Sequence, residues 1–233
     1  DILKDYVSIE LRKNGLTEIE MKPIDGGASK SISFPEPVYN SSLLGNPEYD
    51  ASTIRYSYTS LNRPTTLYEY NVEDEITTKL KEQEVPSGFN PDDYTVERIW
   101  ATASDGVEVP MAIVYKKDLK RDGSNPALIY SYGSYGISSD VYFSTAYYSL
   151  IDRGFVFAIA QIRGGSDLGE QWYEDGKLLK KKNTFTDFIA CSEKLIEDKY
   201  TSANKLAAMG GSAGGLLMGA VANMRPDLYQ TIV

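Results

Sequence analysis

The sequence predicts an α/β domain over residues 95–233, preceded by an all-β segment over residues 1–72. From residue 126 onward, apolar runs typical of buried strands alternate with helical patterns, which indicates a parallel sheet with helices on both faces. Residues 1–72 contain short alternating runs typical of strands, with no helical pattern between them. Residues 73–94 are charged and interrupted by proline and glycine. They predict a linker between two domains, although a surface loop within one domain also fits this composition.

The composition excludes several classes of function. The chain has 233 residues, 42% of them hydrophobic and 24% charged, which is ordinary for a globular protein. A net charge of -9 argues against nucleic-acid binding. The longest apolar stretch, 155–160, is too short to cross a membrane. One cysteine, Cys191, leaves no internal disulfide and no cysteine-based metal site. Neither a metal nor a cofactor is expected.

The all-β segment begins with two alternating runs, 6–11 and 18–21, on either side of a turn signal at 13–15. Further runs at 31–34, 54–58 and 66–70 continue the pattern. Short strands at this spacing fit a propeller blade, a sandwich or a meander.

The α/β domain is expected to open with two strands that flank the hairpin turn Asp105-Gly106. The predicted strands are 96–103, 109–115, 126–132, 155–162 and 206–209. A helix over 143–153 is expected to end before Gly154, which suits the left-handed position after a helix. A second helix is expected to begin at Thr184-x-x-Asp187, which resembles a capping box. The third runs from Ala213 to Met224 and stops before Pro226.

The stretch Gly210-Gly-Ser-Ala-Gly214 fits the pattern G-x-S-x-G. It lies between a predicted strand and a predicted helix, the order that a nucleophile elbow requires. The pattern therefore predicts that Ser212 is exposed at the tip of a sharp turn, at the carboxyl end of a strand, where α/β sheets place their sites. A glycine-rich turn without chemistry is the alternative interpretation.

Several motifs, taken together, resemble the prolyl oligopeptidase family of serine peptidases. They are Asp105–Met111, Tyr130–Gly136, Arg163–Gly165, Gly169–Tyr173, Lys182–Phe185, Gly210–Gly215 and Asn223–Asp227. Ala213 after the serine, together with 172–177 and 180–185, resembles the oligopeptidase B branch. The resemblance implies a seven-bladed propeller that caps an α/β-hydrolase domain and cleavage of short peptides after Arg or Lys. Residues 1–72 would then be the last part of the propeller, and 73–94 the crossing into the hydrolase domain.

The resemblance also implies the roles of four residues. Ser212 is the nucleophile, and the Tyr132 hydroxyl and the Ala213 backbone N–H form the oxyanion hole. Tyr135 lines the S1 pocket. From the residues alone, Tyr132 could be one more packed aromatic side chain, and Tyr135 a surface tyrosine in a loop.

The sequence contains no histidine, and this departs from the pattern of the family. In this fold the triad follows the order Ser, Asp, His, so the acid and the base are expected after Ser212. The carboxylates that bind a basic P1 side chain are expected there too. The chain alone is therefore expected to lack normal peptidase activity and to need the remainder of the catalytic domain from another segment.

Other polar residues near the motifs receive no catalytic role. Arg163 and Glu170 are expected to anchor a loop through a salt bridge, and residues 180–182 to form a solvated entry to a helix. No physical argument makes Asp175 the triad acid.

Several alternative functions also have to be weighed against the sequence. Prolyl oligopeptidase itself is disfavoured by Ala213, because that enzyme carries Asn after the nucleophile. An esterase would usually lack the all-β segment, and a non-catalytic peptide-binding module would have no use for the elbow. The glycines around Ser212 do not give G-x-G-x-x-G, which excludes dinucleotide binding.

Overall fold

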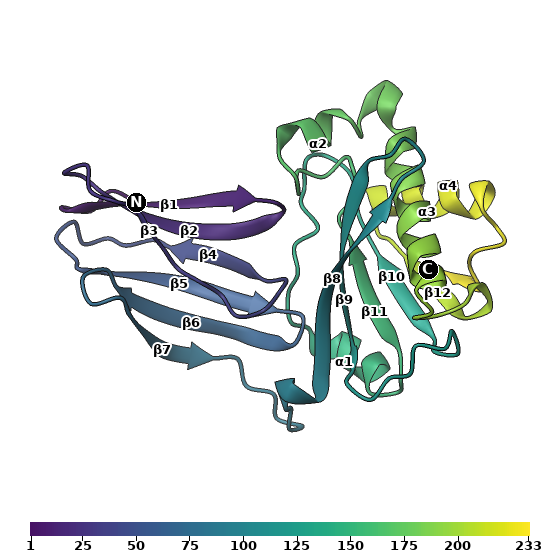
Figure 1. The fold of residues 1–233 in the computed structure, drawn as a ribbon, viewed down its shortest axis with the longest axis horizontal. Helices are drawn as coiled ribbons and strands as arrows, with labels where there is room; N and C mark the ends of the chain where they lie inside the picture. Colours follow the sequence, from purple (N-terminus) through teal and green to yellow (C-terminus); the bar gives the residue numbers. More distant parts are fainter. The chain divides into compact units, whose positions relative to one another are not determined.

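The computed structural model describes residues 1–233, which divide into two compact units (Figure 1). The first contains Asp1–Phe89 and Val141–Phe143, and the second contains Asn90–Asp140 and Ser144–Val233. None of the helices is both long and apolar enough to cross a membrane.

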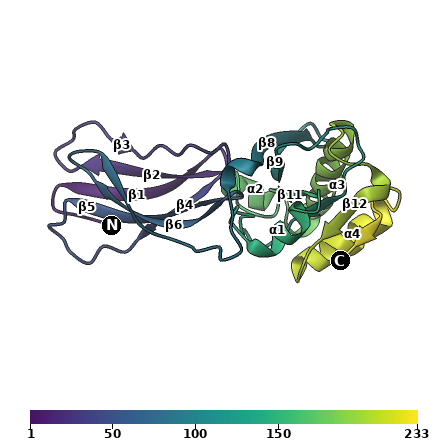
Figure 2. The same ribbon diagram turned by 90° about the horizontal axis from the view of Figure 1, so that it is seen from below.

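The first unit consists of two antiparallel sheets (Figure 2). The three-stranded sheet contains β1 (Tyr6–Lys13), β2 (Leu16–Pro23) and β3 (Lys30–Ser31). The four-stranded sheet contains β4 (Asn40–Leu44), β5 (Thr53–Ser60), β6 (Arg63–Asn71) and β7 (Ile76–Glu82). A buried hydrogen bond of 3.0 Å between the hydroxyls of Thr17 in β2 and Ser41 in β4 links the two sheets.

Aromatic side chains form much of the core of the first unit. Tyr56 and Tyr58, on β5, are almost fully buried. The Tyr58 ring stacks on Phe34 with a centroid separation of 5.0 Å, and the Tyr56 ring stacks on Tyr68 at 5.4 Å. Residues 141–143 join this unit because the Phe143 N–H donates to the Thr59 hydroxyl over 3.1 Å and its ring packs on Phe89.

The structure differs from the expected layout of the all-β segment in two places. β4 falls where no strand was expected, and β7 falls inside the linker predicted over 73–94. The backbone of β7 pairs with β6, but every residue of β7 is exposed. Because no residue of the strand is buried, its composition is charged and threonine-rich, like that of a loop. The boundary between the two units falls after Phe89.

The second unit is built on a six-stranded mixed sheet with the order β13-β12-β10-β11-β9-β8. Its strands are β8 (Tyr94–Thr102), β9 (Glu108–Lys116), β10 (Ala127–Tyr130), β11 (Val156–Ala160), β12 (Leu206–Met209) and β13 (Thr231–Ile232). The four strands from β13 to β11 are parallel, whereas β9 and β8 form an antiparallel hairpin at one edge. A parallel sheet with an antiparallel edge is common in α/β proteins.

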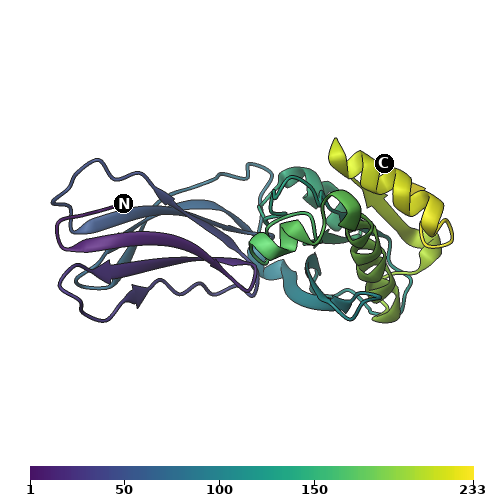
Figure 3. The ribbon, with the colours of Figure 1, turned by 90° about the horizontal axis from the view of Figure 1, so that it is seen from above.

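Helices cover both faces of this sheet. They are α1 (Thr145–Ile151), α2 (Glu170–Glu174), α3 (Lys182–Glu197) and α4 (Ala213–Met224). Ala158 of β11 shares a core cluster with Phe188 of α3 and Leu217 of α4. The neighbouring Phe157 points to the opposite face, because side chains alternate along a strand, and its ring stacks on Tyr147 of α1 at 3.9 Å. Figure 3 shows α4, in yellow, close to the C-terminus.

Two helix starts differ from those expected. α1 begins at Thr145 rather than at residue 143, because residues 141–143 pack in the first unit. α3 begins at Lys182, and the pair Thr184 and Asp187 does not form a capping box. The Thr184 hydroxyl instead donates to the carbonyl of Arg163 over 2.8 Å, and Asp187 accepts hydrogen bonds from the Arg163 side chain.

Candidate active site

Ser212 lies in a sharp turn between β12 and α4. Its backbone has φ 56° and ψ -118°, the conformation of the first central residue of a type II′ turn. Glycine dominates that position because a side chain there crowds the backbone. A serine held in this conformation costs roughly 1–3 kcal/mol, so the surrounding structure must impose it. Backbone outliers of this kind are concentrated at active sites.

Two glycines allow the turn to close. A Cβ atom at Gly210 would lie 2.5 Å from the carbonyl oxygen of Gly214, and one at Gly214 would lie 3.0 Å from the carbonyl oxygen of Ser131. The first helical turn therefore packs directly on the chain that leaves β10. The glycines of the G-x-S-x-G pattern are required by these close approaches, as the sequence predicts.

The turn leaves two polar groups, the Ser212 hydroxyl and the Ala213 N–H, available to bind a ligand. Ser212 is exposed, and its side chain makes no hydrogen bond to the first turn of α4. The N–H groups of Gly214 and Gly215 donate to the carbonyls of Gly211 and Ser212, so they are occupied. The Ala213 N–H has no such partner. It lies at the positive end of the dipole of α4, which favours an anion.

The conformation of Ser212 predicts a measurable strain. In the full-length protein, we expect Ser212→Gly to have a free energy of unfolding about 1 kcal/mol higher than that of Ser212→Ala, since glycine adopts positive φ without strain. Urea denaturation of the two variants measures the difference. A glycine variant less stable than the alanine variant would contradict a strained elbow.

Tyr132 follows β10, the strand beside the one that carries the elbow. β10 and β12 are parallel, and Tyr130 pairs with Met209, so Tyr132 and Ser212 both lie just beyond the carboxyl ends of neighbouring strands. A Cβ atom at Gly214 would lie 3.8 Å from the Cα atom of Tyr132. The structure therefore brings Ser212, Ala213 and Tyr132 to one edge of the sheet.

Tyr135 lies at the surface of the second unit. Its side chain is 74% exposed, its φ is 59°, and its ring centroid lies 6.4 Å from that of Tyr132. We call residues 132–136 the tyrosine turn, because Tyr132 and Tyr135 flank it. Gly133 and Gly136 also have positive φ, so three residues of the turn share this unusual conformation.

The tyrosine turn is fitted closely to the loop after β11. A Cβ atom at Gly133 would lie 2.6 Å from Thr184 Cγ2, and one at Gly164 would lie 2.2 Å from the Gly133 carbonyl oxygen. The Gly136 N–H donates to the Gly164 carbonyl over 3.0 Å. The position of the turn therefore depends on residues that are distant in the sequence.

Arg163 anchors that loop by bonding two carboxylates. Its guanidinium donates to Asp187 over 2.6 and 2.8 Å and to Asp105 over 2.6 and 3.2 Å, and its side chain is 5% exposed. These bonds hold the pKa of Asp105 below its usual range. Arg163 therefore anchors the loop, as expected from the sequence, but its partners are Asp187 and Asp105. Glu170 is instead an exposed residue at the start of α2.

The three lysines at 180–182 differ from one another. Lys180 pairs with Asp175 over 2.6 Å, and Lys182 is exposed. Lys181 is half-buried, and its Nζ donates to the Gly133 carbonyl over 2.5 Å and to the Ser134 hydroxyl over 2.6 Å. The expectation of a solvated helix entry is therefore wrong for Lys181, because its ammonium group binds the tyrosine turn.

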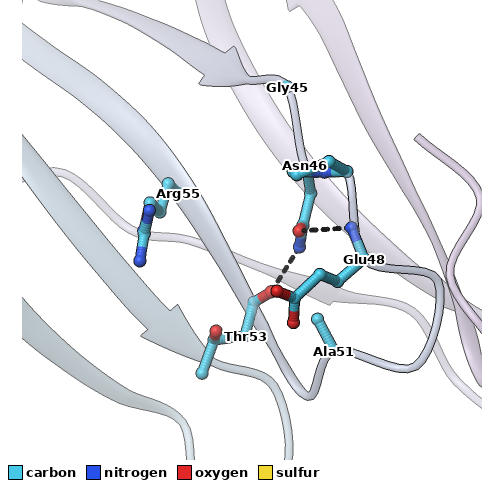
Figure 4. A pocket seen from close by; sticks show the side chains of 7 residues that line it. Gly45, Asn46, Glu48, Ala51, Thr53 and Arg55 are labelled. Carbon is cyan, nitrogen blue, oxygen red and sulfur yellow. Dashed lines mark hydrogen bonds between the residues drawn. The ribbon is translucent and has the colours of Figure 1, made fainter.

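A polar pocket in the first unit contains none of the predicted site residues (Figure 4). Asn46 and Thr53 both line the pocket, and the side-chain amide of Asn46 donates to the Thr53 carbonyl over 2.7 Å. Glu48 and Arg55 also line it.

Comparison with known proteins identifies the family. The model of the prolyl oligopeptidase family matches residues 141–233, and the model of the prolyl oligopeptidase N-terminal beta-propeller domain matches residues 1–83. The chain belongs to the prolyl oligopeptidase family. The sequence-based resemblance is thereby confirmed, together with an α/β catalytic domain preceded by part of a propeller domain.

Individual relatives match nearly the whole chain. Dipeptidyl aminopeptidase BI of Pseudoxanthomonas mexicana is 48% identical over 100% of the chain and 32% of its own length. Protease 2 of Moraxella lacunata is 43% identical over 99% of the chain and 33% of its own length. The structure of oligopeptidase B from Trypanosoma brucei is similar with a TM-score of 0.92 and 38% identity, covering 100% of this chain and 34% of that one. The chain thus spans about a third of the length of these relatives.

Proposed function

We propose that the chain is the part of a serine peptidase that carries the nucleophile, Ser212, and the oxyanion hole, formed by the Tyr132 hydroxyl and the Ala213 N–H. The observation that carries the proposal is the backbone of Ser212, held at φ 56° between a parallel strand and a helix with its side chain exposed. A peptide-binding module has no need of a strained, exposed serine, because binding does not require a positioned nucleophile.

In the proposed reaction, the Ser212 oxygen attacks the carbonyl carbon of a peptide bond while a base accepts its proton. The carbonyl electrons move to the oxygen, and the resulting anion accepts hydrogen bonds from the Tyr132 hydroxyl and the Ala213 N–H. Collapse of this intermediate breaks the C–N bond, and the base returns the proton to the leaving amine. Water then hydrolyses the acyl-enzyme by the same steps.

The base and its orienting acid are proposed to come from outside these 233 residues, since the sequence contains no histidine. Structures of prolyl oligopeptidase B from Galerina marginata with bound substrate contain variants in which a serine, an aspartate or a histidine is replaced by alanine. These three residue types are those of a Ser-Asp-His triad, which supports the proposal that the full-length form of this protein uses such a triad.

We infer that the substrates are short peptides cleaved after Arg or Lys. Two similar solved structures are of oligopeptidase B, and the net charge of -9 favours the approach of cationic ligands. Tyr135 is proposed to line the S1 pocket, where its exposed ring would cover the stem of a long basic side chain. The chain is further proposed to cross from the propeller to the catalytic domain after β7.

A second candidate is the release of dipeptides from a free N-terminus. It is favoured by the 48% identity to a dipeptidyl aminopeptidase over the full chain. Prolyl endopeptidase activity has weaker support, from a relative that is 38% identical.

A substrate panel on the full-length protein distinguishes these candidates. It compares peptides with P1 Arg, P1 Lys and P1 Pro, each with a free and with a blocked N-terminus. The proposed function predicts the highest kcat/KM for P1 Arg or Lys whether or not the N-terminus is blocked. A strict requirement for a free N-terminus would favour the dipeptidase, and a preference for Pro would exclude a basic specificity.

The 233-residue chain alone is expected to give no turnover of an Arg-peptide substrate above a no-enzyme control. A serine without a base retains little nucleophilicity at neutral pH. Fluorogenic peptide hydrolysis by the purified chain, beside the full-length protein as positive control, measures this. Hydrolysis by the chain at the rate of the full-length protein would contradict the proposal that Ser212 needs a histidine base from outside these 233 residues.

A further inference from the structure

Lys181 occupies a position that is unfavourable for a lysine in three respects. It is the residue immediately before α3, where the helix dipole favours negative charge. Its side chain is half-buried, and burial lowers the pKa of its ammonium group. No carboxylate lies within ion-pair distance of its Nζ.

Two hydrogen bonds offset the unfavourable position of the Lys181 ammonium group. Its Nζ donates to the Gly133 carbonyl over 2.5 Å and to the Ser134 hydroxyl over 2.6 Å. Ser134 is 7% exposed, so both bonds are shielded from water. Charge-assisted bonds of this kind are about twice as strong as neutral ones.

These contacts fall on the two residues that follow Tyr132. The carbonyl of Gly133 is also the atom that excludes any side chain at Gly164, so Lys181 holds the tyrosine turn at its tightest point. No other side-chain donor from α3 or the residue before it bonds the tyrosine turn.

We propose that Lys181 is a positioning residue that fixes the tyrosine turn, and through it the Tyr132 hydroxyl, at the carboxyl edge of the sheet. The inference rests on the proposed function, because it assigns Tyr132 to the oxyanion hole. Lys181 itself does not reach the reacting atoms in this account. It acts by holding a donor in place before the substrate arrives, and a misplacement of about 1 Å at such a donor can cost about a hundredfold in rate.

The test replaces Lys181 by methionine in the full-length protein, which keeps most of the stem and removes the ammonium group. We expect kcat for a P1 Arg peptide to fall about 10- to 100-fold with KM changed less than threefold. Lys181→Arg retains a donor and is expected to recover most of the lost kcat. Lys182→Met is the matched control, since Lys182 is adjacent and exposed, and it is expected to leave kcat unchanged.

A double variant shows whether Lys181 acts through Tyr132. In a Tyr132→Phe background, Lys181→Met is expected to lower kcat less than threefold, because the donor that it positions is already absent. An equal loss in both backgrounds would overturn the proposal, as would an unchanged kcat in the Lys181→Met enzyme.

Hydrogen exchange supplies a readout that does not depend on activity. In Lys181→Met, the Gly136 amide, which donates to the Gly164 carbonyl, is expected to exchange at least tenfold faster than in the wild-type protein, with no change in Lys182→Met. If the wild-type protein hydrolyses no peptide, the proposed function fails while exchange still tests the role of Lys181. Should Lys181→Met not fold, Ser134→Ala removes one acceptor, and unchanged exchange and kcat in that variant would contradict the proposal.

Discussion

Replacing Ser212 by alanine is expected to lower kcat of the full-length protein by about a millionfold. The proposed mechanism forms a covalent bond to the Ser212 oxygen, and loss of a serine nucleophile in a triad has an effect of about this size. KM should change little, because the exposed Ser212 side chain makes no capping hydrogen bond to α4 that its removal would break. Hydrolysis of a P1 Arg peptide under saturating conditions measures the effect.

The matched control is Ser149→Ala. Ser149 is exposed on α1 and bonds only the Ala146 carbonyl of its own helix, so its removal should leave kcat unchanged. Retention of more than about one per cent of wild-type kcat in Ser212→Ala would assign the nucleophile to another residue.

Replacing Tyr132 by phenylalanine is expected to lower kcat about 100- to 1000-fold and to leave KM almost unchanged. The change removes one donor to the oxyanion and keeps the ring in place. Loss of a single oxyanion-hole donor costs roughly 3–4 kcal/mol of transition-state stabilisation. Because the negative charge develops only in the transition state, the loss should fall on kcat.

Tyr49→Phe provides the comparison for that variant. Tyr49 is 61% exposed in the first unit, so loss of its hydroxyl should not alter kcat. Equal values of kcat for Tyr132→Phe and the wild-type protein would show that Tyr132 is a packed aromatic residue without a role in catalysis.

Local patterns predicted the elements that position the site. The apolar runs predict β11 and β12 within two residues of their ends, and the absence of proline between Ala213 and Met224 predicts α4 with the same first and last residues as in the structure. The elbow was predictable because its requirements are local: a strand, two glycines at fixed spacing, and a helix. The close approaches of Gly210 and Gly214 are the physical reason for that pattern.

The remaining features depend on contacts between distant residues. Lys181 lies within a run of three lysines, and nothing in the run shows that the middle one binds Gly133, 48 positions away. The Arg163 cluster likewise joins Asp105 and Asp187, and the sequence offers no local cue for that pairing. The sequence predicts a linker where β7 lies, because a strand exposed along its whole length lacks the apolar alternation on which strand prediction depends.

The most direct test of the central claim is the site at which a fluorophosphonate probe reacts with the full-length protein. Cleavage after Lys205 places Ser212 in a peptide whose residues 206–233 contain no other serine, so fragment ions from this part of the peptide can assign the adduct to Ser212. We expect one adduct per chain, located on Ser212 and absent from Ser212→Ala. An adduct on another serine, or peptide hydrolysis that persists while Ser212 stays unlabelled, would contradict the assignment of Ser212 as the nucleophile.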